Sequence, residues 1–321
     1  MGVAADHVAA DHVAADRVAT DRPDLGKARR MGLNIVVGIP TVGRAEILRE
    51  TLQELKQQTL RPVRVIVCGT NGQDVAGAAE AGAEVILAAP GLTRQRNAII
   101  EAALDGAGAD IVVFFDDDFL PEPGYLMATE QHLRTHLGTV VTTGVVLSDG
   151  IIGPGLTPAE GRAALRVRSP GAATRPTFSG YGCNMAVRLA PMRDHGLRFD
   201  ERLPLYGWQE DVDLSRRLAA FGDVIRLGNA AGVHLGVKSG RGKGVRLGYS
   251  QVANPLYLSS KRCGYPWARA LQHIARNMAK NLVRAGFPEP YVDRRGRLWG
   301  NILAIGDLLL GRMKPERILQ L

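Results

Sequence analysis

The chain has 321 residues, 45% of them hydrophobic and 22% charged, which is enough to bury one substantial core with an appendage. No apolar run approaches the roughly 20 residues that cross a bilayer, and no secretory signal is present, so we expect a cytoplasmic protein. The three cysteines, Cys68, Cys183 and Cys263, are odd in number and widely spaced, which argues against a disulfide framework or a zinc site.

The basic charge of the chain limits its partners. A net charge of +8 and a pI near 9.7 predict a surface that attracts polyanions. Nucleic acid, anionic lipid and phosphorylated substrates all match that charge. Aromatic residues make up only 5% of the chain, and no basic segment is interleaved with them, so no nucleic acid is expected as a partner.

The N-terminus is repetitive. Residues 3–22 read VAADH, VAADH, VAADR and VATDR, a five-residue unit repeated four times. A period of five residues matches neither a helix nor a strand, so the repeat cannot present one apolar face. We expect residues 1–30 to form a disordered low-complexity tail, dispensable for catalysis, in which His7 and His12 are solvated.

From Asn34 on, predicted strands alternate with predicted helices. The expected strands are residues 34–39, 63–68, 84–87, 111–115 and 140–147. The expected helices are residues 45–57, 74–81, 93–104 and 125–137. This alternation is typical of a mostly parallel sheet that helices cover. The Gly- and Pro-rich residues 150–176 are expected to form a loop.

The most informative segment is residues 111–118, in which five apolar residues end in Asp116, Asp117 and Asp118. Three adjacent carboxylates repel one another unless a cation lies among them, so they indicate a divalent cation and a polyanionic ligand. The alternative is a solvated acidic turn. Ligands gather at the carboxyl ends of parallel strands, and this position favours the binding site.

Other predicted strands end in polar segments. Residues 39–44 and 68–74 are small and polar, and a nucleotide could lie against them. Residues 91–97 open a helix with Arg94 and Arg96 in its first turn. Cations there oppose the helix dipole, and an anionic ligand would relieve the conflict. A surface turn with salt bridges is the alternative.

A second acidic pair lies farther along the chain. Glu210 and Asp211 open a predicted helix in which Leu214, Leu218 and Phe221 recur at helical spacing. The helix dipole favours ionised carboxylates in the first turn, a position that suits a general base. Ordinary capping of the helix by acids is the alternative.

Taken together, these motifs resemble family 2 glycosyltransferases of the GT-A fold, of the bacterial type that builds exopolysaccharides or cell-surface glycans. The resemblance covers residues 34–234 and depends on Pro40-Thr41, Arg96-Asn97, the strand end Phe114 to Asp118, and Glu210-Asp211-x-Asp213-Leu214-x-x-Arg217. It implies an α/β fold: a Rossmann-like, mostly parallel GT-A sheet with helices on both faces in residues 31–240, followed by a helical C-terminal extension, residues 241–321.

The resemblance also implies an activity. A sugar would pass from a nucleoside diphosphate sugar, expected to be a UDP-sugar, to a hydroxyl of a glycan acceptor, with inversion at the anomeric carbon. The chain lacks the Gln-x-x-Arg-Trp signature of processive synthases, so a single addition per encounter is expected. It departs from the family at Cys68-Gly69-Thr70-Asn71, where an acidic pair and a serine-rich turn are usual.

The roles of single residues follow from the same resemblance. Asp118 and Asp116 would bind Mg²⁺ or Mn²⁺ on the diphosphate, and His234 is the candidate for a further ligand, with a structural histidine as the alternative. Asp211 would deprotonate the acceptor, which Glu210 and Trp208 would contact. The donor site would be lined by Pro40, Thr41, Arg44, Asp74, Arg96, Asp116 and Asp117.

The C-terminal extension contains an amphipathic segment, residues 267–284. One helical face holds Trp267, Leu271, Ile274, Ala275, Met278 and Leu282, and the opposite face holds Arg269, Arg276, Lys280 and Arg284. The helix either packs on the catalytic domain with its basic face in water, or lies on an anionic membrane surface. The second interpretation suits a polyprenyl-diphosphate-linked acceptor and a peripheral location on the cytoplasmic face of the inner membrane.

Two other functions compete with glycosyl transfer. A nucleotidyltransferase also pairs a doubly wound sheet with carboxylate-bound metal, but it needs a glycine-rich first loop followed by a basic residue, which residues 38–44 only faintly resemble. A non-catalytic nucleic-acid-binding protein is supported by the basic charge alone. Steep salt dependence of nucleic-acid binding, with no transfer from nucleotide sugars, would favour it.

Overall fold

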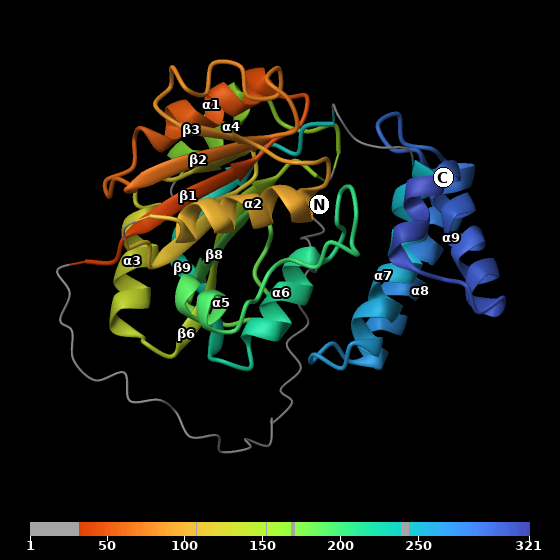
Figure 1. The fold of residues 1–321 in the computed structure, drawn as a ribbon. Coiled ribbons are helices and arrows are strands. Elements are labelled where there is room, and N and C mark those ends of the chain that lie inside the picture. The colour runs from red at the N-terminus through yellow and green to blue at the C-terminus, as the bar shows by residue number, and fades with distance from the viewer. Residues whose placement is uncertain (1–31, 107, 152, 168–170, 239–243) are drawn as a thin grey trace. The chain divides into compact units, whose positions relative to one another are not determined.

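A mixed sheet of nine strands runs through the computed structural model, which describes residues 32–321 apart from 107, 152, 168–170 and 239–243 (Figure 1). The strands are β1 (Ile35–Pro40), β2 (Arg64–Gly69), β3 (Glu84–Leu87), β4 (Ile111–Phe115), β5 (Phe119–Pro121), β6 (Thr139–Asp149), β7 (Arg175–Pro176), β8 (Asn184–Arg188) and β9 (Asp223–His234). The predicted tail, residues 1–30, and the predicted domain boundary at residue 240 lie outside the described residues, and the division there stays a prediction.

The strand order is β3-β2-β1-β4-β8-β6-β9-β5, and β7 pairs with β9. The half formed by β3, β2, β1 and β4 is parallel, as the sequence predicts. In the other half only β6 and β9 are parallel, because β8 runs antiparallel to β4 and β6, and β5 and β7 run antiparallel to β9. The sheet is therefore mixed.

Ten helical segments accompany the sheet within the described part of the chain. They are α1 (Ala45–Leu55), α2 (Leu92–Leu104), α3 (Tyr125–Thr135), α4 (Pro158–Arg166), α5 (Leu189–Asp194), α6 (Glu210–Leu218), α7 (Gly244–Ser260), α8 (Trp267–Gly286), α9 (Arg294–Leu309) and the 3₁₀ helix η1 (Pro315–Gln320). None of these helices is long and apolar enough to span a membrane.

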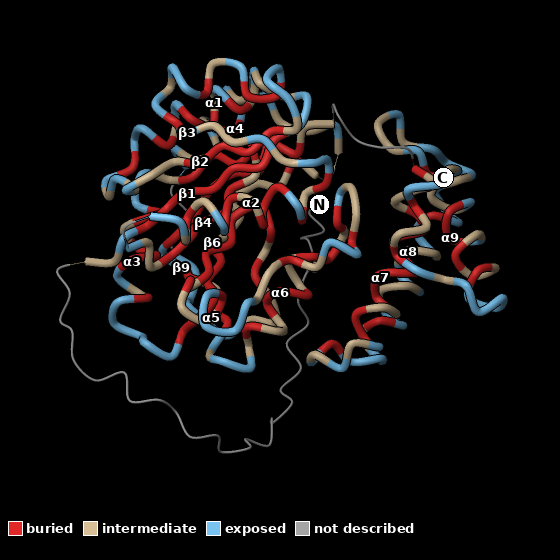
Figure 2. Tube along the Cα trace, in the orientation of Figure 1, coloured by how far each residue is buried: buried red, intermediate tan, exposed pale blue. Residues whose placement is uncertain are grey.

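The central strands are apolar along their whole length because helices cover both of their faces. Every residue of β1 and β4 is buried (Figure 2). Val37 and Val113 pack in one core cluster with residues of α1 and α3, whereas Val36 and Val112 pack in another with residues of α2 and α6. Continuous hydrophobic runs are the expected pattern for strands buried on both sides. The α/β fold class is confirmed.

Two local expectations from the sequence are wrong. Residues 74–81 form turns and no helix, because Gly77, at φ +82°, adopts the left-handed conformation, which interrupts a right-handed helix. The expected loop at residues 150–176 contains α4, which begins with a capping box between Thr157 and Glu160 and has Pro158 in its first turn. That Thr-Pro-x-Glu pattern was a readable signal for a helix start.

The helices of the C-terminal extension contact one another around a small core of their own. Ile274 and Met278 of α8 pack against this core, so part of the predicted apolar face points inward. Trp267, Leu271 and Leu282, from the same predicted face, are 54%, 58% and 65% exposed. The helical extension is confirmed, but much of its apolar surface is left uncovered.

Close packing inside the sheet can be tested at Gly38 in β1. A Cβ atom there would lie 2.4 Å from Cγ2 of Ile99, which is fully buried and cannot move aside. We expect Gly38→Ala to lower the free energy of unfolding by about 1–3 kcal/mol, measured by chemical denaturation. Gly286→Ala is the control, since an added Cβ there meets no atom within 4 Å. Equal stability of the two variants would contradict this account of the packing.

Candidate functional site

The loops after β1 and β2 meet at the carboxyl edge of the parallel half of the sheet. The backbone N–H of Thr41 donates to the carbonyl of Cys68 at 2.9 Å. Nε2 of Gln95, from α2, donates to the carbonyl oxygens of both Thr41 and Cys68 at 2.8 Å. Gln95, which the sequence motifs did not single out, therefore fixes the two loops to each other.

Asp74 joins the same two loops through its carboxylate. One oxygen accepts from the N–H of Gly43 at 2.7 Å, and the other accepts from the N–H of Thr70 at 2.9 Å. Burial would raise the pKa of Asp74, but these bonds and the Thr70 hydroxyl lower it. The structure thus shows Asp74 holding loop backbone at the predicted donor site, and it places Pro40 at the buried end of β1.

The acidic triplet is divided between the protein interior and the site. Asp117 is fully buried and accepts hydrogen bonds from Thr41 Oγ1 at 2.7 Å and Arg44 Nε at 3.1 Å. Burial raises the pKa of Asp117 to about 7, although Arg44 counteracts the rise. Thr41 and Arg44 are therefore both bonded to Asp117, the middle acid of the triplet.

Asp116 and Asp118 converge on His234 at the end of β9. Each of the three offers a ligand atom, and these atoms lie within 4.8 Å of one another. Nε2 of His234 is 3.4 Å from Oδ1 of Asp118 and 4.0 Å from Oδ2 of Asp116. Two carboxylates and an imidazole form a donor set that suits Mn²⁺ and accommodates Mg²⁺. The structure brings the predicted ligands together.

The electrostatics of this triad fit a cation. Burial would lower the pKa of His234, but hydrogen bonds to Asp118 and Asp149 raise it to about 10. Burial would raise the pKa of Asp118, but His234 and then Arg44 lower it to about 2. The acids thus stabilise positive charge at this point, which in the metal-free protein is the imidazolium of His234. A divalent ion bound through Nε2 would displace that proton.

Asp149, at the end of β6, orients the imidazole of His234 through Nδ1, the ring nitrogen that does not face Asp116 and Asp118. Nδ1 of His234 donates to Oδ1 of Asp149 at 2.9 Å, and the Tyr181 hydroxyl donates to Oδ2 at 3.0 Å. The bond at Nδ1 leaves Nε2 facing Asp116 and Asp118, as in other histidine sites for metals. Sequence reasoning missed Asp149, because its role depends on the pairing of β6 with β9.

Arg96 connects the triad to the second acidic pair. Its guanidinium is buried, donates to Asp116 Oδ1 at 3.1 Å and to the carbonyl of Gly182 at 2.8 Å, and forms an ion pair with Glu210. The rings of Phe114 and Phe199 lie 5.5 Å and 5.3 Å from its central carbon. The buried guanidinium of Arg96 therefore lies between the carboxylates of Asp116 and Glu210.

Glu210 and Asp211 lie in the first turn of α6, as predicted. Oδ2 of Asp211 accepts from the N–H of Gly182 at 2.8 Å. Burial raises the pKa of Asp211, and burial together with the charge of Asp211 raises the pKa of Glu210 to about 8 although Arg96 opposes it. A carboxylate with a raised pKa takes up a proton more readily.

The C-terminal helices hold the residues just before α6. Asn254 of α7 donates to the carbonyl of Trp208 at 2.8 Å. Nε2 of Gln209 donates to Nδ1 of His273 of α8 at 2.8 Å. Gln209 itself has a left-handed backbone, φ +72°, which a residue other than glycine adopts at a cost. The position of the acidic pair thus depends in part on the extension.

Comparisons with known proteins bear on the family of one part of the chain and on the fold. Residues 36–154 match the family model described as Glycosyl transferase family 2, a range that contains Asp116 and Asp118 but neither α6 nor His234. No curated protein sequence matches the chain significantly.

Several solved structures share the fold at low identity. Residues 1–349 of S. aureus TarS are 17% identical, with a TM-score of 0.53 over 89% of this chain and 82% of that one. The mannosyltransferase PcManGT from Pyrobaculum calidifontis, in complex with GDP-Man and Mn²⁺, is 18% identical, with a TM-score of 0.50 over 85% and 87%. GalNAc-T7 with UDP, GalNAc and Mn²⁺ is 13% identical, with a TM-score of 0.53 over 90% and 56%.

The orienting role of Asp149 can be measured directly. We expect Asp149→Ala to weaken Mn²⁺ binding about ten- to hundred-fold, because His234 loses the group that fixes its ring. Isothermal titration of the metal-free protein with Mn²⁺ gives the affinity. Asp223→Ala, at the exposed opposite end of β9, should bind as the unchanged protein does. Undiminished affinity in Asp149→Ala would remove Asp149 from the site.

Proposed function

We propose that the chain, whose residues 36–154 match the family 2 glycosyltransferase model and whose fold is shared with TarS, is a glycosyltransferase of this family. It would move a sugar from a nucleoside diphosphate sugar to a hydroxyl of a glycan acceptor, with inversion. The observation that carries the proposal is the cluster of Asp116, Asp118 and His234, which Arg96 connects to the acidic pair on α6. Structures of similar fold hold UDP-GlcNAc in TarS and GDP-Man with Mn²⁺ in PcManGT, which supports a nucleotide-sugar donor.

The triad would hold Mg²⁺ or Mn²⁺ against the donor diphosphate. A bound divalent ion neutralises the charge that develops on the diphosphate as the glycosidic bond breaks. The protein fixes each ligand separately. Arg96 holds Asp116, the N–H of Val237 donates to Asp118 at 2.8 Å, and Asp149 holds His234.

The remaining donor-site residues would shape the nucleotide pocket. Arg44 keeps 24% of its side chain exposed and lies 3.5 Å from Asp118, so it can face the diphosphate. Thr41, Asp74 and Asp117 are buried, and they would act by holding the loop backbone that the nucleotide contacts. We expect a UDP-sugar, although the loop that contains Thr70 differs from the usual uridine-binding turn.

Asp211 is the proposed general base. Its carboxylate would take the proton of the acceptor hydroxyl while the hydroxyl oxygen bonds to the anomeric carbon. The bond to the diphosphate breaks on the opposite face, and its electron pair leaves with the diphosphate, which inverts the centre. Burial raises the pKa of Asp211 and makes it the stronger base. Glu210 is paired with Arg96 and would position the acceptor together with Trp208.

The acceptor is proposed to be a lipid-linked glycan in polysaccharide biosynthesis, such as a chain on polyprenyl diphosphate. The protein would then work peripherally on the cytoplasmic face of the inner membrane. Support comes from the extension, because Asn254 and His273 hold the residues just before the base and so join α7 and α8 to the acceptor side of the site.

The metal site is tested at Asp118. We expect Asp118→Asn to abolish Mn²⁺-dependent binding of nucleotide sugars, because the amide oxygen can still accept from Val237 but the charge is lost. A thermal-shift screen of UDP-, GDP- and dTDP-sugars with and without Mn²⁺ detects the loss without an acceptor. Asp194→Asn, on an exposed residue, is the matched control. Unaltered Mn²⁺-dependent affinity in Asp118→Asn would count against the assigned metal site.

The base is tested at Asp211. Asp211→Asn keeps an acceptor for the N–H of Gly182 but cannot take a proton. We expect donor affinity to stay near that of the unchanged protein while kcat falls by roughly 10²–10⁴-fold. Steady-state transfer assays and donor titrations separate the two effects. Turnover that survives the substitution would assign the base to another residue.

A further inference from the structure

The positive charge of the chain is concentrated at its C-terminus. Residues 261–321 contain 12 Lys or Arg and 4 Asp or Glu, so these 61 residues alone carry a net charge of +8. The preceding 260 residues contain 28 of each kind and are balanced. The first 260 residues therefore contribute no net charge, and the basic character of the chain belongs to residues 261–321.

The exposed apolar side chains gather in the same region. Of the 18 large apolar residues that are well exposed among the described residues, 11 lie between Trp267 and Leu319. On α9, Trp299 and Ile302 are 54% and 48% exposed, and Leu309 reaches 82%. From residue 298 to residue 310 Asp307 is the only charged residue, and its side chain is buried. The outer side of α9 is therefore uncharged over about four turns.

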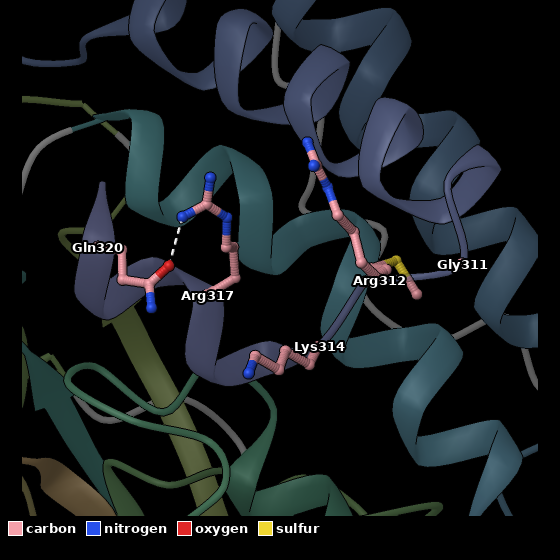
Figure 3. Close-up of a pocket in the computed structure, with 6 residues that line it drawn as sticks. Gly311, Arg312, Lys314, Arg317 and Gln320 are labelled. Carbon is pink, nitrogen blue, oxygen red and sulfur yellow. Dashed lines mark hydrogen bonds between the residues drawn. The ribbon is translucent and has the colours of Figure 1, made fainter.

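A basic pocket adjoins the end of this apolar surface. Its volume is about 560 Å³, and it is lined by Gly311, Arg312, Met313, Lys314, Arg317 and Gln320 (Figure 3). Arg312 and Arg317 both pair with Asp307, and Lys314 is the third cation of the lining. The exposed Leu309 and Leu310 precede the pocket directly in the chain. An apolar surface and a cationic pocket thus lie end to end.

We propose that α8, α9 and residues 310–320 form a docking surface for an anionic lipid bilayer. Exposed apolar side chains, among them Trp299, Ile302 and Leu309, enter the boundary between headgroups and acyl chains. The pocket around Lys314 binds lipid phosphate. Helices with an apolar face bordered by cations bind membranes in this way.

The charge distribution favours lipid over a second copy of the chain. A symmetric dimer through this surface would bring two regions of net charge +8 together, which is unfavourable without counter-ions. An anionic leaflet supplies the opposite charge. A leaflet of anionic headgroups also suits the positions of the cations. Arg295 lies just before the apolar stretch of α9, and Arg312 and Lys314 lie just after it.

The proposed lipid-binding helices are also bonded to the residues just before the acidic pair of the candidate site. His273 of α8 bonds to Gln209, which directly precedes Glu210. The same group of helices therefore contacts the lipid and supports the residues that receive the acceptor. The inference rests on the membrane location in the proposed function, but it is measured by lipid binding without donor or acceptor, so it can fail while sugar transfer stands.

Vesicle cosedimentation of the full chain tests the proposal. The vesicles are phosphatidylcholine alone or phosphatidylcholine mixed with phosphatidylglycerol. We expect the unchanged protein to bind only the mixed vesicles. Leu309→Gln/Leu310→Gln should weaken that binding roughly ten-fold or more. Arg312→Gln/Lys314→Gln should weaken it about five-fold for each charge removed.

Matched controls separate the surface from general hydrophobicity and charge. Leu87→Gln/Leu137→Gln removes two apolar side chains that are 57% and 53% exposed elsewhere, and Arg134→Gln/Arg193→Gln removes two exposed cations. Both should bind mixed vesicles as the unchanged protein does, and thermal melting confirms that each variant is folded. The proposal is overturned if the Leu309/Leu310 variant binds like the unchanged protein, or if the unchanged protein binds no vesicles and instead dimerises through this face.

Discussion

One buried guanidinium holds the two halves of the site together. Arg96 contacts Asp116 on the side of the proposed metal site and Glu210 on the side of the proposed base, and Gly182 supplies a carbonyl. An isolated charge at that depth would cost many kcal/mol, so it is tolerated only because acids and a carbonyl surround it. The proposed ligands and the proposed base are consequently kept in a fixed relation by a group that reaches no solvent.

The topology of the sheet makes this arrangement possible. The parallel half brings the ends of β1, β2 and β4 to one edge, where α2 begins and presents Arg96. The antiparallel β8 then enters beside β4, and Gly182 lies just before it. Gly182 accepts from Arg96 through its oxygen and donates to Asp211 through its nitrogen. A wholly parallel sheet would not supply that backbone between the two acidic groups.

Local patterns were enough to predict part of this site. The apolar run before Asp116 identified the strand end, and the spacing of Leu214 and Leu218 placed Glu210 and Asp211 in a first turn. Asp149 could not be predicted, because its contact depends on two long strands whose pairing shifts register more than once. The sequence also could not predict that the side chain of Asp117 points into the interior. After the end of a strand, side-chain directions depend on tertiary contacts, here the hydrogen bond from Thr41.

The central claim is that Asp116, Asp118 and His234 hold one divalent ion while Arg96 keeps Asp116 joined to Glu210. A crystal structure with Mn²⁺ and a nucleoside diphosphate tests it most directly, because manganese is located by its anomalous scattering. The account predicts a single manganese peak among the three side chains, with the Arg96 bridge intact. A peak elsewhere, or Arg96 turned from Glu210 to the diphosphate, would contradict it.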